Sequence, residues 1–264
     1  MNRETACVIS PAFIKICCVG TIVTWSCILI VGVLLAQLDP SGPNFDPAGF
    51  NPLIDYLSNM GSIHYTPFPF IFNFGITFIA LLMIPVTFYL KKLMIGDNSC
   101  VIRKILALLF TVLMVTGFIF LILVGWINQE LSKTWEQQFS YPLNACNWHF
   151  TLASISFSCI ILGGGVFTLF SLIFLNFLRE KLLIQNPIRG KILLVVNYFI
   201  LTPIFLTLFT SCPLLHSEDL FWKTLPIWKW ATFWEWLFAI SMTIGMFFVC
   251  ISLFRPLNAK LRKP

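Results

Sequence analysis

Three short polar clusters hold the side chains of this sequence that could do chemistry. The groups that could transfer protons are the carboxylates and imidazole of Asp55, His149 and Glu235. The groups that could hold a substrate by hydrogen bonding or stacking are Ser58, Asn59, His64, Asn73 and Trp236. A carboxylate and an imidazole together, such as Glu235 with His149, can act as acid and base on an ester or an amide.

Each of these candidates also has a purely structural explanation. An acid such as Glu235 in the first turn of a helix is favoured by the helix dipole. A histidine such as His149 at a membrane boundary can serve as a hydrogen-bonding fixture, and Asp, Ser and Asn are typical helix-capping residues. Both interpretations stay open at this point, and the sequence does not decide whether the protein is an enzyme.

The elements that must position these clusters are membrane helices. The chain has 264 residues, of which 58% are hydrophobic and 11% charged, and its mean hydropathy is +0.87. Soluble domains carry roughly 25% charged residues. This composition excludes a disordered chain, a disulfide scaffold and an ordinary soluble enzyme. We expect an all-α fold because lipid offers no partner to an unpaired backbone group.

Six apolar stretches are long enough to cross a bilayer, which takes about 20 helical residues. They run over about 16–38, 68–90, 105–127, 148–178, 192–211 and 232–254. Residues 1–264 are therefore predicted to form one six-helix transmembrane domain, with short inner loops that make neighbouring helices antiparallel. The fourth stretch is long enough to require a steep tilt or a continuation beyond the lipid. The first outer loop is predicted to be ordered, with a short helix near Pro52–Met60.

The distribution of charge predicts the orientation. With the N-terminus inside, the inner segments hold fourteen basic residues and the outer loops only Lys133, Lys223 and Lys229. This bias places both termini in the cytoplasm, at the cytoplasmic membrane if the source is a prokaryote. Eight of the eleven acids and all three histidines then lie on the outer side. We therefore interpret the basic balance as topology and contact with anionic lipids, and we predict no nucleic-acid partner.

Cysteines and cofactor motifs add little. The nine cysteines form no CxxC pair, and most of those in the apolar stretches are expected to be small hydrophobic filler. Cys146 and Cys212 both fall near the outer face, where an oxidising compartment would allow them to pair. Because neither a zinc-binding spacing nor a nucleotide-binding loop is present, we predict no metal site and no cofactor.

Short motifs at three places resemble those of known membrane families. Residues 51–75 resemble the first outer loop of a six-span prokaryotic family of unknown function, and the pattern is also similar to the eukaryotic DRAM/Sfk family. Matching positions are Ser58-Asn59-Met60-Gly61, His149 and Glu235-Trp236, although Asn59 stands where these families tend to carry Asp. The resemblance implies a six-span fold and a membrane role, and it implies no settled reaction.

Three classes of function remain. The first is lipid handling or lipid sensing, with membrane lipids as partners, through an outer-face pocket lined by the polar clusters. The second is a non-catalytic scaffold or regulator. The third, a small-solute transporter, ranks lower because no charged residue lies in the middle of a span.

Overall fold

The computed structural model describes residues 10–38, 57–61, 68–96, 100–127, 148–174, 176–204 and 231–261, and these ranges are mostly helical with no strand among them. The helices are α1 (Pro11–Cys27), η1 (Ile28–Gly32), α2 (Val33–Leu38), η2 (Leu57–Gly61), α3 (Pro69–Ile95), α4 (Val101–Trp126), α6 (Trp148–Ile173), α7 (Phe177–Glu180), α8 (Pro187–Val195), η3 (Val196–Leu201) and α10 (Ala231–Leu261).

Six helical segments are long and apolar enough to cross a membrane. They are Pro11–Leu35, Pro69–Ile95, Val101–Trp126, Thr151–Ile173, Pro187–Ile204 and Phe233–Leu261. The first contains the π-helical turn η1, and the fifth runs from α8 through the π-helical turn η3. The predicted all-α, six-span architecture is confirmed.

Local sequence sets several of the helix ends. Proline begins α1, α3 and α8, where its missing N–H is not needed and its fixed φ suits the first turn. The side chain of Asn186 caps α8 by accepting a bond of 3.1 Å from the backbone N–H of Arg189. Gly96, with φ of 64°, ends α3 in a conformation that other residues rarely adopt.

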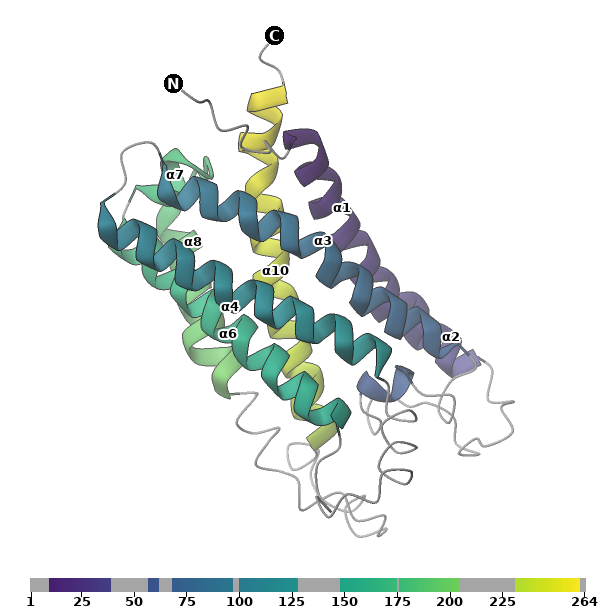
Figure 1. Ribbon diagram of the computed structural model, residues 1–264. Helices are drawn as coiled ribbons and strands as arrows, with labels where there is room; N and C mark the ends of the chain where they lie inside the picture. Colours follow the sequence, from purple (N-terminus) through teal and green to yellow (C-terminus); the bar gives the residue numbers. More distant parts are fainter. Residues whose placement is uncertain are drawn as a thin grey trace, which may run out of the picture.

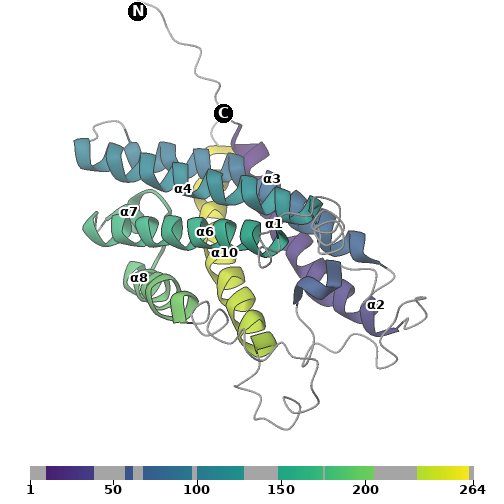
Figure 2. The same cartoon turned by 60° about the horizontal axis from the view of Figure 1, so that its bottom comes forward.

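The spans form a ring in chain order. α1 packs against α3, α3 along α4, and α4 along α6. α6 contacts α8 and η3, η3 contacts α10, and α10 returns to α1. Figure 2 shows the succession of α4, α6 and α8 across one side of the bundle. The two pairs of spans that short inner loops join, α3 with α4 and α6 with the fifth span, are thus neighbours, as predicted.

Glycines allow two of these contacts to be very close. A Cβ on Gly164 of α6 would overlap the ring of Tyr198 in η3, and one on Gly163 would lie 2.6 Å from Sδ of Met114 in α4. Small residues at such crossings let membrane helices approach through their backbones. Gly163 and Gly164 of the fourth span therefore serve helix packing.

The fourth span is shorter than the sequence predicts. α6 ends at Ile173, and residues 177–180 form the separate short helix α7. The apolar character of this stretch comes from burial within the protein, because the ring of Phe177 packs edge-on against that of Phe170 at 4.9 Å between centroids. The sixth helix is longer than predicted and continues through Pro256 to Leu261.

The two ends of the bundle differ in charge. The start of α1 and the end of α10 lie at the same end (Figure 1). That end, called the basic end below, carries the lysines and arginines of the described ranges, namely Lys15, Lys91, Lys92, Arg103, Lys104, Arg179, Lys181, Arg189, Lys191, Arg255 and Lys260. The opposite end, called the η2 end, holds η2, the end of α4 and the starts of α6 and α10 (Figure 1). Which of these ends faces the cytoplasm stays a prediction.

Candidate functional site at the η2 end

Glu235 connects the last span to the first outer loop. It lies near the start of α10, is half-buried, and its Oε2 accepts a hydrogen bond of 2.7 Å from the backbone N–H of Leu57. Leu57 is the first residue of η2, and the first N–H groups of a helix have no partner inside it. The carboxylate therefore caps η2 from another helix and complements the positive end of its dipole.

Asn73 holds the other end of η2. Its Nδ2 donates a hydrogen bond of 2.9 Å to the carbonyl oxygen of Gly61, the last residue of η2. A Cβ on Gly61 would collide with Oδ1 of Asn73 and lie 3.1 Å from the ring of Phe72, so the approach requires glycine. Two spans thus hold the two ends of one short helix. We call Glu235, Asn73 and η2 together the η2 clasp.

Apolar contacts dock η2 between these two bonds. The side chains of Leu57 and Met60 are 6% and 2% exposed. Sδ of Met60 faces Gly32 of η1, at 3.7 Å from the position that a Cβ there would take. Burying a Leu or Met side chain contributes about 1.5–3 kcal/mol. Burial therefore supplies most of the docking energy, while the hydrogen bonds fix the orientation of η2.

The crossing of α3 and α4 positions Asn73. Gly125 of α4 approaches α3 so closely that a Cβ there would lie 2.6 Å from the carbonyl oxygen of Asn73. That same oxygen accepts a bond of 3.0 Å from Oγ1 of Thr77. The backbone at Asn73 is therefore fixed on two sides, and its side chain is left to reach η2.

His149 joins two neighbouring spans at this end. Its ring is buried, and Nδ1 lies 2.8 Å from the carbonyl oxygen of Ile127, the C-cap residue of α4. Because a carbonyl oxygen only accepts, Nδ1 carries the proton and Nε2 of the neutral ring presents a lone pair. Such bonds satisfy the carbonyls left open at a helix C-terminus.

His149 lies two residues before the Thr151–Ile173 span. Burial lowers the pKa of its imidazole, and the bond to Ile127 acts in the opposite direction. The net direction is downward, so the ring is neutral at pH 7. A neutral imidazole can accept a proton or a hydrogen bond at Nε2.

The clasp brings together part of the predicted site. Glu235 and Asn73 meet the Ser58-Asn59-Met60-Gly61 motif through η2. Trp236 is half-buried and packs against the apolar core. The side chains of Ser58 and Asn59 and the whole of Asp55 and His64 lie outside the described residues. A direct pairing of Glu235 with His149 stays a prediction.

Two partners in the clasp are backbone groups that sequence reasoning missed. The N–H of Leu57 and the carbonyl of Gly61 carry no side-chain pattern that could mark them. The glycine itself was the one available signal, because Gly61 ends the motif and only glycine fits against Asn73. Within the described ranges, no three His, Cys, Asp or Glu side chains come together as a metal site.

A second polar group lies inside the bundle, between η3 and α10. Oγ of Ser241 donates a bond of 2.9 Å to Oδ1 of Asn197 and lies 2.6 Å from Oγ1 of Thr202. All three side chains are at most 1% exposed. Nδ2 of Asn197 has no hydrogen-bond partner among the described residues and faces Gly245. We call these three residues the interior polar cluster.

These features define a class of protein. Six apolar helices in one ring, with a charged and hydrogen-bonded group at one end, make the chain a multi-pass α-helical membrane protein. Comparisons with protein-family models, curated proteins and solved structures find no match to this chain. The resemblance to six-span families therefore rests on the motifs alone.

Proposed function

We propose that the protein binds a membrane lipid by its headgroup at the η2 clasp and thereby handles or senses that lipid. One observation carries the proposal: the half-buried carboxylate of Glu235 is held at the end of the bundle by the backbone N–H of Leu57. A carboxylate is costly in the bilayer centre and much less so at the interface, where headgroups lie. The predicted orientation places this end at the outer leaflet.

The chemistry of the clasp favours a headgroup that carries an amine. Glu235 supplies a negative charge, and Trp234 and Trp236 flank it in the sequence. A carboxylate binds an ammonium group by charge-assisted hydrogen bonds, and indole rings attract cations through their faces. Phosphatidylethanolamine offers an ammonium group that can make both contacts, the quaternary ammonium of phosphatidylcholine can bind only the charge and the indole faces, and phosphatidylglycerol carries no cation.

Lipid retention by two matched variants tests this proposal. Glu235→Gln keeps an oxygen that can accept the bond from Leu57 and removes the charge. Glu180→Gln is the control, because Glu180 is the other acid of the described ranges and lies exposed in α7 near the basic end. Purified proteins are equilibrated with equal amounts of the three lipids and analysed by native mass spectrometry.

The wild type and Glu180→Gln should retain an amine-bearing lipid. Glu235→Gln should retain about tenfold less, since a tenfold change corresponds to about 1.4 kcal/mol, which is within the range of a charge-assisted bond. Equal retention by all three proteins, or a preference for phosphatidylglycerol in the wild type, would overturn the proposal.

A further inference from the structure

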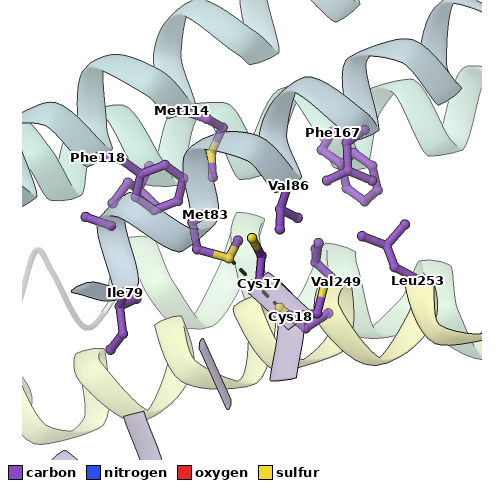
Figure 3. Close-up of a cluster of buried hydrophobic side chains, with 14 of the residues drawn as sticks. Cys17, Cys18, Ile79, Met83, Val86, Met114, Phe118, Phe167, Val249 and Leu253 are labelled. Atoms are coloured by element: carbon purple, nitrogen blue, oxygen red, sulfur yellow. Dashed lines mark hydrogen bonds between the residues drawn. The ribbon is translucent and has the colours of Figure 1, made fainter. Parts of the chain in front are cut away.

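Four sulfur-containing side chains are buried where α1, α3 and α10 pack together. Cys17 and Cys18 come from α1, Met83 from α3 and Cys250 from α10. All four are at most 3% exposed. Figure 3 shows Cys17, Cys18 and Met83 in one view of the buried core, together with Val86 and Val249. This cluster lies toward the basic end, since Cys18 is seven residues, or about 10 Å of helix, from the start of α1.

One pair of sulfur atoms in the cluster has the spacing expected of two ligands of one metal ion. Sγ of Cys250 lies 3.9 Å from Sδ of Met83, to which its thiol donates a weak hydrogen bond. The thiol of Cys250 also contacts that of Cys18. Metal–sulfur bonds are about 2.3 Å long, so the corners of a planar three-coordinate site lie about 4 Å apart. The separation of Cys250 and Met83 fits one edge of this triangle.

We propose that Cys18, Cys250 and Met83 form a three-coordinate binding site for Cu(I). Two thiols and a thioether are soft donors, and soft donors select Cu(I) over harder divalent ions. Zn²⁺ usually takes four ligands from Cys, His, Asp and Glu. Cys18 and Cys250 are two such ligands, and within the described ranges no three His, Cys, Asp or Glu side chains are arranged as a metal site.

Cu(I) binding at this site would release protons and leave a small net charge. Each of the two thiols loses its proton as its sulfur binds the metal, and Met83 binds as a neutral thioether. Copper remains in the +1 state, two protons are released, and the site carries one net negative charge. Lys15 lies one turn before Cys18 on α1, and further basic residues surround this end of the bundle. The predicted orientation places the site toward the cytoplasm, where thiols stay reduced.

The test is competition for Cu(I) between the full-length protein and a chromophoric Cu(I) chelator. Protein in detergent is kept anaerobic and reduced, and bound copper is counted by mass spectrometry after desalting. The wild type should hold one Cu(I) per chain. Cys18→Ser, Cys250→Ser and Met83→Leu should each bind Cu(I) at least about tenfold more weakly. Even the loss of a group that only orients a metal ligand lowers metal affinity about 10–100-fold.

Matched controls separate ligand loss from general damage. Cys27→Ser and Cys159→Ser remove cysteines elsewhere in the spans, and Met114→Leu replaces another buried methionine. These variants should bind Cu(I) as the wild type does. Melting temperatures should rise with Cu(I) in the wild type and the controls, while the three ligand variants should fold but show no such rise.

X-ray absorption of the copper complex should show three sulfur atoms at about 2.3 Å. Copper that is absent from the wild type, or held equally by Cys18→Ser and Cys250→Ser, would overturn the proposal. So would a preference for Zn²⁺ over Cu(I). The site is independent of the η2 clasp, so Glu235→Gln should leave its copper affinity unchanged.

Discussion

The η2 clasp and the interior polar cluster use similar hydrogen bonds in opposite surroundings. The side chains of the interior cluster are neutral and at most 1% exposed. Asn197 lies in η3, Thr202 directly follows η3, and Ser241 lies in α10. The clasp contains a carboxylate, its side chains Glu235 and Asn73 are half-buried, and it joins a loop segment to two spans.

These two surroundings determine which polar groups a ligand could reach. Polar side chains inside a membrane bundle bond across helices and contribute to association between them. The interior cluster therefore stabilises the packing of the fifth span on the sixth. A charged group at the end of the bundle can meet headgroups, so the clasp is the place where binding is expected. Variants of the interior cluster should change stability, and variants of the clasp should change binding.

The largest effect is expected from a glycine inside the bundle. Gly164→Ala would place a Cβ against the ring of Tyr198, and such overpacking costs about 1–3 kcal/mol. The matched control is Gly165→Ala, whose Cβ would meet the ring of Phe199 at an ordinary 3.7 Å. Thermal unfolding in detergent should show a clear loss for Gly164→Ala and none for Gly165→Ala. Equal melting temperatures would refute this account of the packing.

A smaller effect is expected from Ser241→Ala. The change removes two hydrogen bonds of the interior cluster and leaves Asn197 and Thr202 short of a partner, which should cost about 1 kcal/mol. Ser171→Ala is the control, because Ser171 is equally buried but bonds only the carbonyl of Phe167 in its own helix. Lipid retention should be the same in both variants. If Ser171→Ala were as destabilising as Ser241→Ala, the cross-helix role would be wrong.

The smallest effect concerns pH and His149. Because burial lowers the folded-state pKa of this histidine, the unfolded chain binds more protons near its ordinary pKa of about 6.5. Stability from this group is thus fully present above about pH 6.5 and is lost as the pH falls below it. Melting temperatures of wild type and His149→Gln should converge as the pH falls from 7 to 5. A constant difference across that range would contradict the assignment.

The sequence allowed the architecture to be predicted because the bilayer imposes it. A run of about 20 apolar residues must be helical, and six such runs are found as helices. The ends of the helices were less predictable. Hydropathy cannot distinguish Phe177, which packs against Phe170, from a residue that faces lipid. Nor does it mark the extension of α10 to Leu261, since a helix need not stop at the membrane surface.

The sequence predicted the polar side chains of the candidate site but not the groups to which they bond. Glu235 and Asn73 were identifiable as polar side chains close to the ends of spans. Their partners, the backbone groups of Leu57 and Gly61, become available only when η2 folds against α3 and α10. Likewise, the bond from His149 to Ile127 depends on how α4 meets α6. Such contacts arise from tertiary packing, which no local pattern encodes.

The most direct test of the clasp is hydrogen–deuterium exchange of the η2 amides in wild type, Glu235→Leu and Glu180→Gln, with and without an amine-bearing lipid. Glu235→Leu removes the acceptor of the Leu57 N–H, so that amide should exchange at least about tenfold faster than in the wild type, as an open hydrogen bond allows. Added lipid should slow exchange in wild type and Glu180→Gln and leave Glu235→Leu unchanged. Identical exchange of Leu57 in all three proteins, unaffected by lipid, would contradict the account.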